Sequence, residues 1–161
     1  MSSQLKVLLF LRQKEGGGGV CYKHDGERFD HPHTLKLNQD TDYIITVQSP
    51  LLLRDLMIQG EKYELKEVRP ETGKKSDDNF RFSAVFNTSG FAVEKRNNRK
   101  NVTVVLMFDG EVTLTTLLQC KFYPQSETDH SRWGNALSWI EYDCRLTEGQ
   151  SGVLINKELF H

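Results

Sequence analysis

Apolar and polar residues alternate with a period of two along much of the chain. In FRFSAVF, at 80–86, every second residue from Phe80 to Phe86 is apolar, and the residues between them are more polar as a set. The stretches 5–11 and 42–48 alternate in the same way. Because successive side chains of a strand point to opposite faces of the sheet, these stretches predict half-buried strands. No long run has the period of a helix.

The residues 101–123 predict a β-hairpin. Two runs rich in Val, Leu and Thr flank Asp109 and Gly110. An Asp-Gly pair tolerates the positive φ angles of a type I′ turn, so a tight two-residue turn is expected between the two strands.

Similar patterns between turn residues predict further short strands. They fall near 5–13, 19–23, 34–37, 42–48, 51–58, 62–68, 80–86, 101–108, 111–122, 138–146 and 153–157. Arg54 and Asp55 would lie on opposite faces of their strand, so a short helix also fits 51–59. The tetraglycine at 16–19 predicts a turn between the first two strands. The sequence therefore predicts an all-β fold, a single antiparallel β-sandwich or barrel domain over residues 1–161, with about ten strands and little helix.

Charge and hydropathy narrow the classes of function. The chain has 21 Lys and Arg against 22 Asp and Glu, a net charge of -1. This balance gives no support to nucleic-acid binding. No apolar run is long enough for a transmembrane segment, and VLLFL at 7–11 is shorter than the core of a signal peptide. We expect a cytoplasmic protein that reaches the inner face of the plasma membrane only through partners.

The residues that often carry chemistry form no recognisable catalytic or metal motif. Cys21, Cys120 and Cys144 are widely spaced and include no Cys-x-x-Cys pair, which is typical of reduced, buried thiols. His31 and His33 would share a strand face, but Pro32 disfavours a strand there and further ligands are missing nearby. We predict no catalytic residues, no cofactor and no metal, and thus no enzyme.

Two features are candidates for partner binding. Lys95, Arg96, Arg99 and Lys100 lie close together and form a possible electrostatic rim for an acidic peptide or lipid head groups. A solvated hairpin loop is the alternative interpretation of this basic run.

Both tryptophans, Trp133 and Trp139, lie in DHSRWGNALSWIEYDC at 129–144 and are the candidate apolar contacts. The period of two places Trp139 on the face opposite Ile140, Tyr142 and Cys144.

Four stretches resemble a known family in the same order. They are VCYKHDGERFDHPHTLKL (20–37), LQCKFY (118–123), DHSRWGNALSWIEYDC (129–144) and INKELF (155–160), and they resemble the cannabinoid receptor-interacting protein 1 family. The most specific positions are Tyr22, Lys23, Asp25, Gly26, Arg28, Phe29, Asp129, His130, Trp133, Gly134, Ser138, Ile140, Glu141, Tyr142, Cys144, Asn156, Lys157, Glu158 and Phe160. Residues 49–100 are only loosely similar, and the tetraglycine and Trp139 depart from the family pattern.

The resemblance implies a non-enzymatic adaptor. It would bind the cytoplasmic C-terminal tail of a G-protein-coupled receptor, the type 1 cannabinoid receptor, and suppress its constitutive signalling, including tonic inhibition of voltage-gated calcium channels. The implied fold is similar to RhoGDI. The alternative function is therefore a carrier that binds the acyl or prenyl groups of lipidated proteins, or a lipid, in a cavity between the sheets. A connected apolar cavity of several hundred Å³ would favour the carrier, and a filled core would favour the adaptor.

Overall fold

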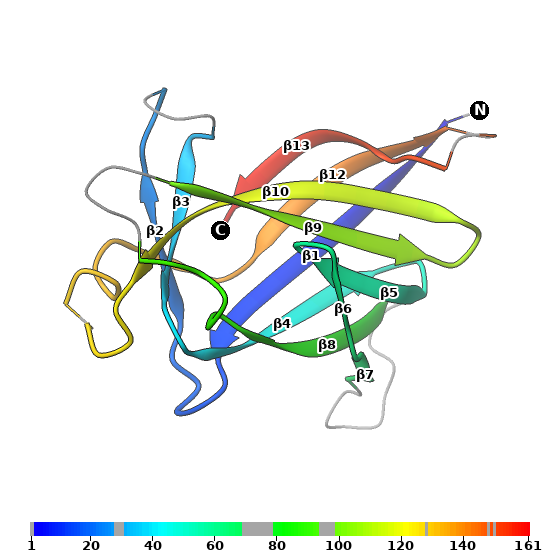
Figure 1. The fold of residues 1–161 in the computed structure, drawn as a ribbon. Helices are drawn as coiled ribbons and strands as arrows, with labels where there is room; N and C mark the ends of the chain where they lie inside the picture. The colour runs from blue at the N-terminus through cyan, green and yellow to red at the C-terminus, as the bar shows by residue number, and fades with distance from the viewer. Residues whose placement is uncertain are drawn as a thin grey trace.

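A computed structural model gives the fold of this chain as two packed β-sheets (Figure 1). It describes residues 2–27, 31–68, 79–93, 99–127, 129–147, 149 and 151–161. These residues form thirteen strands and no helix. The predicted all-β sandwich is confirmed. The strands outnumber the predicted stretches because the stretch at 62–68 divides into β6 and β7 and because the short strand β11 was not predicted.

Sheet A contains six strands in the order β13-β12-β1-β4-β8-β7. Their bounds are β1 Ser2–Gln13, β4 Asp42–Ser49, β7 Lys66–Glu67, β8 Phe80–Asn87, β12 Ile140–Thr147 and β13 Leu154–Phe160. All neighbours within this sheet are antiparallel.

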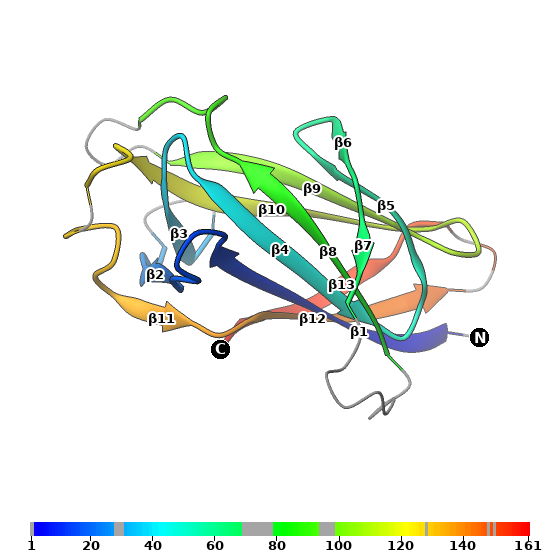
Figure 2. The ribbon, with the colours of Figure 1, turned by 90° about the horizontal axis from the view of Figure 1, so that it is seen from below.

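Sheet B contains seven strands in the order β11-β2-β3-β10-β9-β5-β6. Their bounds are β2 Val20–His24, β3 His33–Asn38, β5 Leu53–Ile58, β6 Glu61–Tyr63, β9 Lys100–Phe108, β10 Val112–Tyr123 and β11 Asn135–Leu137. The pair β3 and β10 is parallel, whereas the other neighbours are antiparallel. Figure 2 shows the β9–β10 hairpin on one side of the molecule and β1 with β12 on the other.

The core lies between the sheets and follows the period of two. Residues that alternate along β1, β4, β9, β10 and β12 are buried against one another, and they include Leu5, Val7, Leu9, Leu11, Tyr43, Ile45, Val47, Val102, Val104, Leu106, Leu114, Ile140, Tyr142 and Cys144. Burying each such aliphatic or aromatic side chain contributes about 1.5–3 kcal/mol before the loss of conformational entropy. The sequence pattern therefore identified the face that packs inward.

One local prediction, the turn of the β9–β10 hairpin, needs correction. The β9–β10 hairpin forms, but Phe108 pairs with Val112, so its loop has three residues rather than the two of a type I′ turn. Positive φ angles occur at Gly110 and Glu111 instead of at Asp109 and Gly110. The strand predicted at 51–58 is confirmed as β5, and the alternative of a helix at 51–59 is not, but the pairing of β5 with β9 shifts register between Leu53 and Asp55. This irregularity explains the broken alternation at Arg54 and Asp55.

Replacing Leu9 by Ala should lower the free energy of unfolding by about 3 kcal/mol, because Leu9 is fully buried between the sheets and its removal leaves a cavity. Leu159→Ala, on the partly exposed face of β13, is the matched control and should cost less than about 1 kcal/mol. Urea unfolding followed by circular dichroism measures both values. Equal losses in the two variants would contradict the core described above.

Candidate functional site

An exposed tryptophan marks the loop that joins β10 to β11. Trp133 is 70% exposed, the largest exposure among the big apolar residues that the structure describes. We call the described residues 124–127 and 129–134 the Trp133 loop. Exposed tryptophans are common at the centre of protein interfaces because the ring offers a large, rigid contact area.

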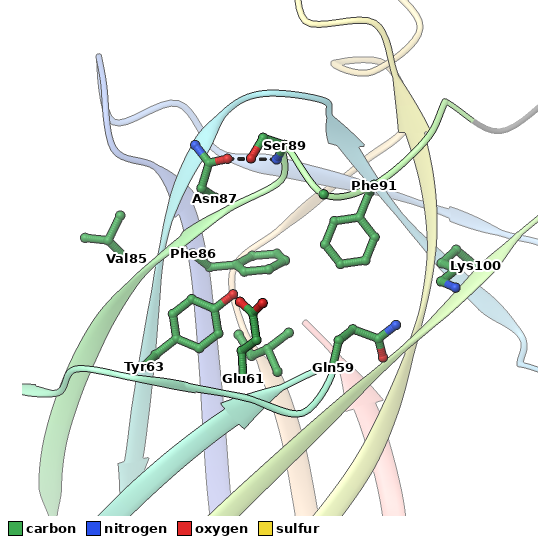
Figure 3. Close-up of a pocket in the computed structure, with 11 residues that line it drawn as sticks. Gln59, Glu61, Tyr63, Val85, Phe86, Asn87, Ser89, Phe91 and Lys100 are labelled. Carbon is green, nitrogen blue, oxygen red and sulfur yellow. Dashed lines mark hydrogen bonds between the residues drawn. The ribbon is translucent and has the colours of Figure 1, made fainter.

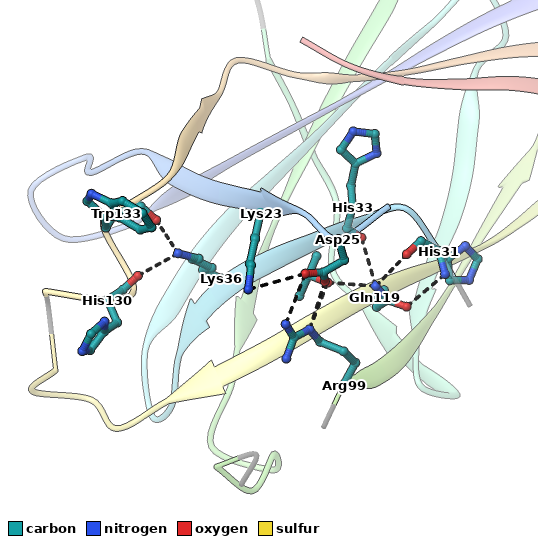
Figure 4. A network of polar contacts seen from close by, with 10 residues as sticks. Lys23, Asp25, His31, His33, Lys36, Arg99, Gln119, His130 and Trp133 are labelled. Carbon is teal, nitrogen blue, oxygen red and sulfur yellow. Dashed lines mark hydrogen bonds and ion pairs between the residues drawn. The ribbon is translucent and has the colours of Figure 1, made fainter. Parts of the chain in front are cut away.

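A buried lysine anchors the Trp133 loop to sheet B. The Lys36 side chain extends from β3, and the residue is only 6% exposed. Its ammonium group donates hydrogen bonds to the carbonyl oxygens of His130, at 3.1 Å, and Trp133, at 2.5 Å, and it lies 5.3 Å from the centre of the Trp133 ring (Figure 4). Burial lowers the pKa of Lys36, and the nearby charges of Lys23 and Arg99 lower it further. The carbonyls compensate for the burial of the ammonium group, and their bonds to it fix the backbone of the loop, while the ammonium group also makes a cation–π contact with the indole.

Two further contacts shape the loop. The Glu127 carboxylate accepts hydrogen bonds from the backbone N–H groups of His130, at 2.7 Å, and Ser131, at 3.2 Å. These bonds lower the pKa of Glu127, and the bond from His130 has the largest effect. Gly134 has φ +125°, and a Cβ there would lie 3.0 Å from the carbonyl oxygen of Tyr22. Glycine therefore allows the chain to pass close to β2 directly after Trp133.

A network of polar side chains lies next to Lys36 on the outer face of sheet B (Figure 4). Asp25 accepts hydrogen bonds from the Thr34 hydroxyl and from the Arg99 guanidinium, whose Nε lies 3.2 Å from Oδ2 and whose Nη2 lies 3.4 Å from Oδ1. Gln119 joins the network by donating a hydrogen bond to the Thr34 hydroxyl, at 2.8 Å. Its amide group also donates to the backbone carbonyl oxygen of His31 and accepts from the backbone N–H of His31. We call Asp25, Thr34, Arg99 and Gln119 the Asp25 network.

The electrostatics of the Asp25 network favour an ionised carboxylate. Burial of Asp25 opposes ionisation, but the bonds from Thr34 and Arg99 and the charges of Arg99 and Lys23 outweigh it and lower the pKa of Asp25. The side chain of Asp25 has no exposed surface, and that of Arg99 is 5% exposed. A buried, doubly hydrogen-bonded pair of this kind fixes the β2–β3 hairpin to β10 and to the start of β9.

His33 contacts His24 on the neighbouring strand rather than His31. His33 lies opposite His24 on β2, with Nδ1 of His24 3.3 Å from Nε2 of His33, and it stacks on Phe160 with ring centres 4.5 Å apart. His31 instead contacts Gln119 through its backbone. Within the described ranges no three His, Cys, Asp or Glu side chains cluster in a way that could hold a metal ion.

A second surface feature is a pocket of about 450 Å³ between the edges of the two sheets (Figure 3). We call it the aromatic pocket. Tyr63 and Phe86 meet edge to face at 5.9 Å, Phe86 meets Phe91 at 5.7 Å, and Phe91 stacks on the buried Phe122 at 4.5 Å. Its other described lining residues are Ile58, Gln59, Glu61, Val85, Asn87, Ser89, Gly90 and Lys100.

Among the described residues, buried apolar side chains pack closely between the sheets. The apolar void there measures only about 20 Å³ and is lined by Leu11, Leu35, Leu37, Ile45, Ile58, Phe86, Val102, Val104, Leu118 and Cys120. It shares Ile58 and Phe86 with the aromatic pocket. The three cysteines are free thiols; burial raises the pKa of Cys144 to about 11 and that of Cys120 further still.

The structure separates the predicted site residues. Trp133 is exposed, whereas Trp139 lies half-buried on the outer face of sheet A, between Phe10 and His161, with ring centres 6.1 and 5.1 Å away. The indole Nε1 of Trp139 is buried and has no hydrogen-bond partner among the described residues.

The predicted basic rim is also divided. Lys95 and Arg96 lie outside the described residues. Arg99 is buried against Asp25, and Lys100 lines the aromatic pocket. Lys36 was not among the predicted site residues, because its only signal in the sequence was a lysine at a polar position of a predicted strand.

None of the described residues forms a helix long and apolar enough to cross a membrane.

Comparisons with known proteins agree on one family. The family model described as CB1 cannabinoid receptor-interacting protein 1 matches residues 1–160. Proteins of that name from Bos taurus, Homo sapiens and Mus musculus are each 31% identical to this chain over 161 residues, covering 97% of this chain and 95% of theirs.

Replacing Asp25 by Ala should destabilise the fold by about 3 kcal/mol at neutral pH, because it leaves the Arg99 guanidinium buried without its carboxylate. Asp109→Ala removes an exposed ion pair, with Arg54, and should cost less than about 1 kcal/mol. Chemical unfolding measures both.

The pH dependence provides the control for Asp25. Since folding lowers its pKa, its stabilisation is present above the ordinary value of 3.8 and is lost as pH falls through the lower folded value. The gap between wild type and Asp25→Ala should therefore shrink below pH 3.8. A gap that is constant with pH would exclude an ionised Asp25 as its cause.

Proposed function

Because the chain belongs to the CB1 cannabinoid receptor-interacting protein 1 family, we propose that it is a non-enzymatic cytoplasmic adaptor that binds the C-terminal tail of the type 1 cannabinoid receptor. In this proposal it suppresses the receptor's constitutive signalling, including tonic inhibition of voltage-gated calcium channels. The names of its relatives, which cover nearly the whole chain, support the receptor as partner.

The exposed indole of Trp133 is the observation that best supports an adaptor. Lys36, Glu127 and the backbone geometry of Gly134 fix the backbone of its loop, so little backbone freedom remains to be lost when a partner packs on the indole. A preorganised aromatic contact loses less entropy on binding than a mobile one. We infer that the receptor tail packs against Trp133 on the outer face of sheet B.

The filled interior also favours the adaptor. Ligand sites for small molecules usually have volumes of about 300–1,000 Å³. The void between the sheets is about 20 Å³, so an acyl or prenyl chain would enter only after the sheets had moved apart.

The RhoGDI-like carrier of lipidated proteins is the second candidate, and the aromatic pocket favours it. The pocket holds about 450 Å³ and shares Ile58 and Phe86 with the interior void, so rotation of Phe86 would connect the two. Each CH₂ buried there would contribute about 0.8 kcal/mol.

Replacing Trp133 by Ala should weaken binding of a receptor-tail peptide at least tenfold, because a central aromatic contact typically contributes about 2 kcal/mol or more. Its exposed ring makes little contribution to folding, so the unfolding free energy should hardly change. Isothermal titration calorimetry measures the affinity. Leu154→Ala is the matched control, because Leu154 is 60% exposed and lies on the edge strand β13.

The same titration with a palmitoylated and an unmodified tail peptide separates the two candidates. Equal binding of both peptides, lost in Trp133→Ala, supports the adaptor. Binding that requires the lipid and is insensitive to Trp133→Ala would replace the adaptor by the carrier. In cells, wild type should relieve receptor-dependent inhibition of calcium current and Trp133→Ala should not.

A further inference from the structure

Four cations gather on the outer face of sheet B, beside the Trp133 loop. Lys36 on β3 and Lys121 on β10 are register partners in the parallel pair, and Lys23 lies on the adjacent strand β2. Arg99, directly before β9, contacts Asp25 from the other side. We call Lys23, Lys36, Arg99 and Lys121 the basic face. It draws on four separate parts of the sequence.

The basic face carries more positive than negative charge. Asp25 is shared between Lys23, at 3.8 Å, and Arg99, at 3.2 Å. Glu127 uses both carboxylate oxygens to accept backbone N–H bonds. In the part of the chain that the structure describes, no carboxylate lies within ion-pair distance of Lys36 or Lys121. This concentration of positive charge is local, because the whole chain has a net charge of -1.

The lysines of the basic face affect one another. Burial lowers the pKa of Lys121, and the charges of Arg99, Lys23 and Lys36 lower it further. The Lys121 ammonium lies 5.2 Å from the centre of the Tyr123 ring, so it extends over the sheet. A negative group placed above Lys121 and Lys23 would relieve this repulsion.

We propose that the basic face binds an acidic, extended peptide segment of a partner protein, whose apolar side chain packs on Trp133. The inference rests on the proposed function in one respect, that the partner is a peptide. Lys23 and Lys121 are two strands and two residues apart, so their Cα atoms lie roughly 12 Å from each other. Carboxylates at positions i and i+4 of an extended chain, roughly 13 Å apart, match that spacing.

A peptide fits this surface better than an anionic membrane. The basic face is only about two strand spacings wide. Among the strongly exposed apolar residues that the structure describes, Trp133 alone lies beside it. Membrane-binding surfaces usually combine a larger basic cluster with several inserted apolar side chains.

The test uses a short peptide with blocked ends, a central Leu and two Glu residues at i and i+4, together with its Gln counterpart. Wild type should bind the Glu peptide more tightly, with an affinity that falls as salt rises. The double variant Lys23→Gln/Lys121→Gln should lose about five- to twentyfold in affinity, as expected for two exposed ion pairs at low salt. Fluorescence anisotropy of a labelled peptide measures the affinities.

The control variant is Lys62→Gln/Lys157→Gln, which removes two exposed lysines from β6 and β13 and should bind like wild type. Circular dichroism checks that both double variants are folded. Equal affinity for the Glu and Gln peptides, or equal loss in both double variants, overturns the proposal. Binding to phosphatidylserine vesicles that is lost in Lys23→Gln/Lys121→Gln, with no binding of the Glu peptide, would also overturn it in favour of a membrane.

A receptor-tail peptide titrated in parallel separates this inference from the proposed function. If the Glu peptide binds through Lys23 and Lys121 but the tail does not bind wild type, the receptor is the wrong partner and the basic face remains a site for an acidic segment. If the tail binds wild type and Lys23→Gln/Lys121→Gln equally, the receptor stands as partner and the basic face is not its site.

Discussion

Among the described residues, apolar side chains from both sheets pack against one another, and a void between them measures about 20 Å³. In the proposed function, recognition of a partner therefore takes place on the outer faces and edges of the sandwich. The β-strand period places polar side chains there, and two surface features stand out: the Trp133 loop with the basic face, and the aromatic pocket.

On the outer face of sheet B, buried polar groups require partners and thereby order the loops. The Lys36 ammonium needs acceptors, and the carbonyls of His130 and Trp133 supply them. The Asp25 carboxylate needs donors, which come from Thr34 and Arg99. These bonds fix the backbone of the Trp133 loop and of the β2–β3 hairpin, from which the exposed indole and Lys23 extend.

The sequence predicted the strands well because their signal is local. Alternation placed Tyr142 in the core and Trp139 on the opposite face, and both placements are confirmed. The parallel pairing of β3 with β10 had no local signal, since it joins residues about 85 positions apart. The basic face depends on that pairing and was therefore invisible, whereas the basic run at 95–100 was conspicuous. The burial of Arg99 against Asp25 likewise depends on contacts between distant segments.

The central claim is that a partner binds on the outer face at Trp133 and leaves the interior closed. The two tryptophans give two indole N–H signals in a ¹H–¹⁵N NMR spectrum, which Trp133→Phe and Trp139→Phe assign. Addition of the receptor-tail peptide should shift the Trp133 signal and leave the Trp139 signal and the methyl signals of Ile45 and Leu106, deep in the core, unchanged. A shift of those core methyls with the Trp133 signal unmoved would contradict the account.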